Sequence, residues 1–265
     1  MAAVADILRS LDRWAPFETQ MDFDNSGFLV GRGRRGVKKI LVTLDVTEEA
    51  AEEADQWGAE LIVSHHPVIF HPVKAITDES VTGRILLRLL ECGMAAICAH
   101  TNLDAAKGGV NDCLARALGL RQTELLVQDG LDREGRPYGV GRIGTSETPG
   151  LNAGAYAAFV KEALGAVSVR YVDAGRLVAR VAVGGGACAS MLSDAVKAGC
   201  DTFVTADIRY HEYLEAKALG INLMDAGHFA TEQVVCPALV QFLSREFPSL
   251  EVRQSTVHRE VYRQG

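Results

Sequence analysis

The side chains best suited to chemistry in this sequence are histidines and carboxylates that follow short apolar segments. His65 and His66 come directly after the apolar run 61–63 and are followed by Pro67. Proline holds the preceding residue extended and removes one backbone N–H, so a strand is expected to end here. Adjacent residues of a regular strand point to opposite faces, so both imidazoles can serve one site only if it does end. The pair alone fits either a metal or catalytic site or an ordinary strand end.

A second pair of such side chains, His228 and Glu232, lies at the expected start of a helix. Residues four apart share one face of a helix, so this imidazole and this carboxylate can point to the same place. His100 and Asp104 likewise follow an expected strand, 95–99. A pair of this spacing is often only a surface feature, but its position after a strand favours a site.

The elements that must position these side chains alternate between strands and helices from residue 40 onward. Short connections between them predict two α/β domains with mostly parallel sheets, each covered by helices on both faces. Ligands in such folds gather beyond the carboxyl ends of the strands. We expect strands at 40–45, 61–64, 95–99, 202–205 and 222–224, a strand pair at 167–172 and 177–183, and helices at 4–13, 48–58, 80–91, 110–118, 153–164, 189–198 and 234–243, with another ending at 219.

The polar residues at these strand ends are numerous enough for two metal ions. Three imidazoles and two carboxylates exceed the needs of one four-coordinate zinc. A bridging Glu232 would hold two ions at the separation of about 3.5–4 Å that is typical of two-metal hydrolytic centres. The expected ligands are His65, His66, Asp104, His228 and Glu232, and His100, Asp207, His211 and Asp225 are close to them in the sequence.

Three glycine-bearing segments allow both a functional and a structural interpretation. Residues 139–144 spell G-x-G-x-x-G, but turn residues follow instead of the helix that a dinucleotide site requires. The amides of Gly184 to Gly186 could hold an anion, although close packing of a strand on a helix also explains them. Residues 22–31 are typical of a turn before a strand, and their two aspartates could also line a site.

Turn signals between 122 and 150 predict a boundary between two domains. We expect a metal-binding α/β domain made of residues 1–125 plus 228–265. Residues 126–227 would form a second α/β domain.

The composition describes a globular chain with an acidic balance. Its 265 residues are 48% hydrophobic and 23% charged, with a formal net charge of -7. General nucleic-acid binders usually carry a basic stripe, so this charge argues against one. The six cysteines are scattered without a C-x-x-C pair, which favours a reducing compartment. There is neither a signal-peptide core nor an apolar run of roughly 18 to 20 residues, so we expect a cytoplasmic protein without a membrane partner.

Four motifs together resemble the NIF-three-like dinuclear-metal-centre family, whose members are often labelled GTP cyclohydrolase type 2 homologs. They span residues 22 to 236, nearly the whole chain. The motifs are D-N-S-G-F-L-V-G at 24–31, S-H-H-P at 64–67, H-T-N-L-D at 100–104 with G-G-V-N-D at 108–112, and D-A-G-H at 225–228 with Thr231 and Glu232.

The resemblance implies a set of ligands and an assembly. His66, Asp104 and Glu232 would surround one ion, and His65, His228 and Glu232 the other. The family's two-domain subunits assemble into a toroidal homohexamer whose metal sites face an internal cavity. Residues 26 and 28, a serine and a phenylalanine, stand where many members carry other side chains.

The function implied is a metal-dependent hydrolase in which the ions activate water, with His100 or His211 transferring protons. The substrate would be a purine nucleotide or a phosphoester, and the ions would be zinc, iron, manganese, cobalt or nickel. An alternative is a non-enzymatic metal-handling or regulatory oligomer that acts through protein partners. DNA binding by a ring-shaped oligomer fits the acidic charge less well.

Overall fold

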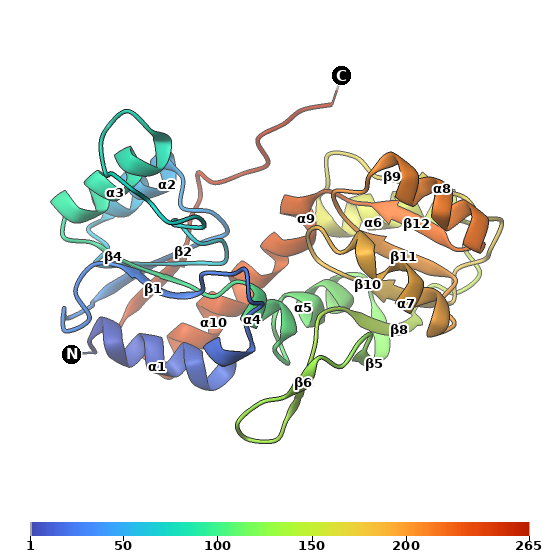
Figure 1. Cartoon of the computed structure of the whole chain (residues 1–265), viewed down its shortest axis with the longest axis horizontal. Coiled ribbons are helices and arrows are strands. Elements are labelled where there is room, and N and C mark those ends of the chain that lie inside the picture. Colours follow the sequence, from blue (N-terminus) through green and yellow to red (C-terminus); the bar gives the residue numbers. More distant parts are fainter. Residues whose placement is uncertain (1, 265) are drawn as a thin grey trace. The chain divides into compact units, whose positions relative to one another are not determined.

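The computed structural model describes residues 2–264, and the chain divides into two compact units (Figure 1). The first unit runs up to Leu103 and also contains Cys236–Arg259. The second contains Asp104–Val235 and the residues from Glu260. The chain therefore crosses between units at other places than the sequence predicted, which were 125/126 and 227/228. The turn-rich stretch 122–150 contains most of an edge strand and the whole of its neighbour in the second unit's own sheet, rather than a linker.

The first unit is built on a five-stranded sheet in the order β1-β4-β3-β2-β13. β1 is antiparallel to β4, and the other neighbours are parallel, as the sequence predicted. Helices α2 and α3 cover one face, and α1 and α10 cover the other (Figure 1). The strands are β1 (Gly27–Val30), β2 (Lys39–Thr43), β3 (Leu61–Ser64), β4 (Ala95–Cys98) and β13 (Glu251–Gln254), and the helices are α1 (Val4–Trp14), α2 (Glu48–Trp57), α3 (Val81–Glu91) and α10 (Cys236–Glu246).

Local sequence explains why these helices begin and end where they do. Thr47 caps α2 by accepting a hydrogen bond from the backbone N–H of Ala50, as expected. Gly58 ends that helix with a φ of 75°, which a glycine adopts without strain. The strands β2, β3 and β4 are almost entirely buried because helices cover both faces of the sheet.

The second unit contains a six-stranded sheet in the order β5-β8-β10-β11-β12-β9. Only β10, β11 and β12 run parallel to one another, and β5, β8 and β9 pair antiparallel. The prediction of a mostly parallel sheet is thus wrong for this unit. The strands are β5 (Leu120–Leu125), β8 (Arg142–Ser146), β9 (Arg170–Val172), β10 (Arg180–Val183), β11 (Thr202–Thr205) and β12 (Asn222–Asp225).

Helices cover both faces of this second sheet. Apolar residues of α5 (Val110–Ala117) and α6 (Ala153–Leu164) form one core cluster with the sheet. Residues of α7 (Leu192–Lys197) and α8 (Tyr210–Leu219) form a cluster on the other side. Shorter elements complete the chain: α4 (Thr101–Ala105), α9 (His228–Glu232), β6 (Gly130–Leu131) paired with β7 (Pro137–Tyr138), and the 3-10 turns η1 (Phe17–Thr19), η2 (Ala189–Met191) and η3 (Gln233–Val235).

Several expected elements differ in detail. The strands expected as a pair at 167–172 and 177–183 are not neighbours, because β9 pairs with β12 and β10 lies between β8 and β11. The segment 139–144 leads into strand β8 and not into a helix, as its turn residues indicated. Among residues 2–264, no helix combines the length and apolar character needed to cross a membrane. The cytoplasmic location stays a prediction.

Candidate metal centre

The first unit brings three histidines together at the carboxyl ends of β3 and β4. β3 ends at Ser64, so the strand stops before the two adjacent histidines, as the sequence predicted. Potential ligand atoms of His65, His66 and His100 all lie within 4.8 Å of one another. The ring centroids are 4.9 to 5.4 Å apart. This cluster can present three nitrogen ligands to one place.

Each of these imidazoles uses its Nδ1 atom for a hydrogen bond to an oxygen. Nδ1 of His65 lies 2.9 Å from the backbone oxygen of Ala99, which can only accept. Nδ1 of His66 lies 2.7 Å from Oδ1 of Asp45. Nδ1 of His100 lies at the same distance from Oδ1 of an aspartate, Asp24. A neutral imidazole that donates from Nδ1 carries its lone pair on Nε2, and this orientation is typical of metal-binding histidines.

Asp24 was interpreted from the sequence mainly as a turn residue, and the structure gives it a further role. Its side chain is buried and accepts hydrogen bonds from His100, from the backbone N–H and hydroxyl of Thr101, and from the hydroxyl of Ser26. Burial alone would raise the pKa of Asp24, but the hydrogen bonds from His100 and Thr101 outweigh it and hold this pKa well below its usual range. Asp24 is therefore an anion that fixes His100.

Asp45 and His258 were missed by the sequence analysis. The Asp45 carboxylate lies between two imidazoles, with Oδ2 2.9 Å from Nε2 of His258 and Oδ1 on His66. Burial would raise the pKa of Asp45, but hydrogen bonds from His258 and His66 lower it well below its usual range. Asp45 comes shortly after β2, as His65 comes after β3. This position beyond the end of a parallel strand could have identified Asp45 as a candidate site residue. His258, 213 residues away, has no local signal.

The second unit brings two carboxylates and one histidine of its own close together. Nε2 of His228 lies 2.9 Å from Oε2 of Glu232, one helical turn along α9, as expected. A carboxylate oxygen of Asp104 lies within 4.8 Å of one of Glu232, and the two residues are only 8% and 3% exposed. Nδ1 of His228 lies 2.7 Å from Oδ2 of Asp207, the same orientation as in the first unit.

A turn of two glycines leaves room for the Glu232 carboxylate. A Cβ atom on Gly186 would overlap Oε1 of Glu232, and one on Gly185 would lie 3.4 Å from its Cγ. Cys188 lies next to this turn and donates from Sγ to the backbone oxygen of Gly185. Burial, with the negative charges of Asp104 and Glu232, raises the pKa of Cys188 well above its usual range. The clusters of potential ligands among the described residues consist of imidazole nitrogens and carboxylate oxygens, a donor set that suits borderline divalent cations.

Asp225 and His211, which are close to the candidate ligands in the sequence, lie outside the ligand clusters of the described residues. Asp225 pairs with Arg170 and accepts a hydrogen bond from the hydroxyl of Tyr213. His211 lies exposed on the first turn of α8, outside the clusters of potential metal ligands among the described residues. Its proposed catalytic role stays a prediction.

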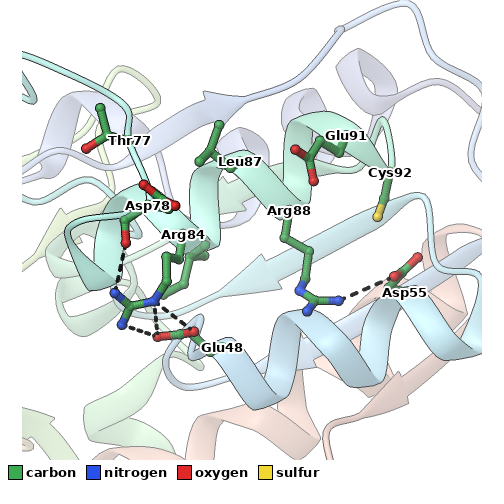
Figure 2. A pocket seen from close by; sticks show the side chains of 10 residues that line it. Glu48, Asp55, Thr77, Asp78, Arg84, Leu87, Arg88, Glu91 and Cys92 are labelled. Carbon is green, nitrogen blue, oxygen red and sulfur yellow. Dashed lines mark hydrogen bonds and ion pairs between the residues drawn. The ribbon is translucent and has the colours of Figure 1, made fainter.

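A separate cavity of about 710 Å³ lies between α2 and α3 in the first unit (Figure 2). Arg84 contacts Glu48 and the backbone oxygen of Asp78, and Arg88 reaches Asp55 at 3.6 Å. Both arginines that line this cavity therefore pair with carboxylates of α2.

Comparisons with known proteins agree on one family. The model of the family Duf34/NIF3 (NGG1p interacting factor 3) matches residues 2–260. A GTP cyclohydrolase 1 type 2 homolog of Clostridium perfringens is 34% identical over 228 residues, which is 86% of each chain. A GTP cyclohydrolase 1 type 2 of Helicobacter pylori is 34% identical over 233 residues, 88% of each. The crystal structure of a Bacillus cereus protein related to NIF3 matches with a TM-score of 0.92 at 26% identity over 99% of both chains.

Proposed function

Because the chain belongs to the Duf34/NIF3 family, we propose that it is a metal-dependent hydrolase with two divalent ions. The observation that carries the proposal is the shared orientation of His65, His66 and His228. Nδ1 of each is hydrogen-bonded to an oxygen, so Nε2 is the nitrogen that can bind an ion. The proposed ligands are His65, His66, Asp104, His228 and Glu232.

Glu232 is the proposed bridge between the ions. His66 and Asp104 complete the ligands of one ion, and His65 and His228 those of the other. Two divalent ions against two carboxylates leave two positive charges, which favours a substrate with an anionic or carbonyl group. Imidazole and carboxylate ligands accept zinc, iron, manganese, cobalt or nickel.

The ions, when bound, would polarise the scissile bond and lower the pKa of water. The chain itself supplies a route for the proton. Asp24 holds Nδ1–H of His100, so Nε2 of His100 can accept a proton from the attacking water. The low pKa of Asp24 keeps that aspartate negative, and the negative charge stabilises the imidazolium that then forms.

The proposed substrate is a purine nucleotide ring or a phosphoester. The purine nucleotide is proposed because the two relatives described above are named for GTP cyclohydrolase 1 type 2. A homohexamer in the cytoplasm is proposed on family resemblance. Light scattering coupled to gel filtration tests the hexamer, since a monomer at micromolar concentration would contradict it.

The test of the function is turnover of GTP and of a phosphoester panel before and after chelation, with metal content measured on the same samples. We expect chelation to abolish turnover and restored metal to recover it. Glu232→Gln should lose both turnover and metal, whereas Glu215→Gln, on the exposed surface of α8, should lose neither. Turnover that survives removal of the metal would contradict the hydrolase mechanism. Two ions per chain without turnover would favour the metal-handling alternative.

A further inference from the structure

A fully buried amide connects the segment of Asp104 to the turn under Glu232. Asn111, on α5, donates from Nδ2 to the backbone oxygen of Asp104 at 3.0 Å. Its Oδ1 accepts from the backbone N–H of Gly185 at 2.9 Å. Both partners fix the orientation of the amide, because one can only accept and the other can only donate.

A buried hydroxyl makes the corresponding connection from the same turn to α9. Thr231 lies between His228 and Glu232, and its Oγ1 accepts from the backbone N–H of Gly186 at 3.0 Å. The same hydroxyl lies 2.9 Å from the backbone oxygens of Gly227 and His228, to which it can donate. The glycine turn is thus bonded to Asp104 through Asn111 and to α9 through Thr231.

Other hydrogen bonds make this turn and the Asp104 segment rigid. The backbone oxygen of Gly186 accepts from the hydroxyl of Thr205 and from the N–H of Ala206, both at 3.0 Å. Arg142, only 4% exposed, donates to the backbone oxygen of Ala106 at 3.1 Å and to Asp112. The chain just after Asp104 is therefore held as firmly as the turn.

This network connects the backbone segments that carry two buried carboxylates. Asp104 and Glu232 are buried within 4.8 Å of each other, and like charges repel more strongly in such surroundings than in water. We propose that Asn111 and Thr231 are positioning residues that hold these carboxylates at the spacing required for a divalent ion. This inference rests on the proposed metal site and extends it to two side chains that need not touch the ion.

The test compares zinc affinity of purified variants, measured by competition with a chromogenic chelator, and the visible spectrum after cobalt substitution. We expect Asn111→Ala and Thr231→Val to lower the affinity about 10- to 100-fold, the usual effect of losing a residue that orients a ligand. Thr231→Ser keeps the hydroxyl and should retain the wild-type affinity and spectrum.

Asn222→Ala provides a matched control in the same unit. Asn222 is equally buried, donates to the backbone oxygen of Arg176 and accepts from the N–H of Ala174, both at 3.0 Å. Its loss should destabilise the fold comparably without changing zinc affinity. If Asn111→Ala does not fold, the Thr231 pair decides the question alone.

The outcomes separate this inference from the function on which it rests. If wild type binds no zinc, or Glu232→Gln binds it equally well, both are wrong. If Glu232→Gln weakens binding while Asn111→Ala and Thr231→Val do not, the inference is wrong and the metal site stands. Equal weakening by Asn222→Ala would show general destabilisation and would also overturn the inference.

Discussion

The two units of this chain position their candidate ligands by different means. In the first unit, neighbouring parallel strands end together, and two aspartates, one before β1 and one after β2, orient histidines that follow β3 and β4. In the second unit, a glycine turn and two buried polar side chains hold carboxylates close together. The first arrangement follows from sheet topology, and the second depends on the hydrogen bonds of individual side chains and on the small size of two glycines. Substitutions should therefore have larger effects in the second unit.

Gly186→Ala should have the largest effect. The added methyl would overlap Oε1 of Glu232, and Gly186 has a φ of 65°. We expect loss of more than about 100-fold in zinc affinity, since the methyl displaces the proposed bridging ligand itself.

Gly199→Ala is the control for backbone strain. Gly199 has a φ of 73°, but its added methyl would have nothing within 4 Å. It should cost about 1 kcal/mol of stability and leave zinc affinity unchanged. Equal affinities of the two variants, measured by chelator competition, would contradict the role of the turn.

Arg142→Met should destabilise the second unit by about 3 kcal/mol, because it removes one partner of a buried ion pair. Arg142 is 4% exposed and makes hydrogen bonds to several backbone oxygens as well as to Asp112. Urea denaturation followed by circular dichroism measures the change. Arg121→Met, at an exposed pair with Glu147, should change stability by less than about 1 kcal/mol. Similar losses in the two variants would show that burial of Arg142 is not decisive.

Asp45→Asn should weaken zinc binding about 10-fold, the lower end of the range for residues that orient a ligand. The amide keeps only one acceptor oxygen, so it no longer accepts hydrogen bonds from both His66 and His258. Its effect should be smaller than that of Asn111→Ala, as the difference between the units requires. A larger loss for Asp45→Asn in parallel titrations would reverse the comparison.

Glu53→Gln should have the smallest effect, confined to the pH dependence of stability. Burial raises the pKa of Glu53, but hydrogen bonds from Ser255 and Thr256 outweigh it and lower the folded-state value below 4.5. The ionised carboxylate therefore adds stability above about pH 4.5, and this contribution is lost as the pH falls through the folded-state pKa. Thermal unfolding between about pH 6 and pH 3 should show a shallower decline in the variant. Identical slopes would contradict the role of Glu53.

Much of the fold could be predicted because its signals are local. Buried strands such as β3 and β4 are almost continuous apolar runs, and helices such as α2 carry their own caps. β13 was missed because Glu251–Gln254 is polar and becomes a strand only by pairing with β2. The direction of β5, β8 and β9 depends on partners distant in the sequence, so it could not be predicted from periodicity.

The candidate site likewise has features with a local sequence signal and features that depend on distant residues. His228 and Glu232 were predicted to share a helical face, and the strand end before His65 was read from Pro67. The residues that orient the candidate ligands come from elsewhere in the chain. Asp45 orients His66, for example, and is itself bonded to His258, which is 213 residues away. Such contacts exist only once the fold has formed, so a single sequence does not contain them as a pattern.

The most direct test of the proposed centre is an anomalous difference map of crystals grown with zinc, collected at the zinc absorption edge. We predict two peaks per chain, each bound by Nε2 atoms and carboxylate oxygens, with Glu232 touching both. A map without these peaks, or with zinc bound through Nδ1 or at other side chains, would contradict the proposal that the orientation of the histidines prepares them for metal.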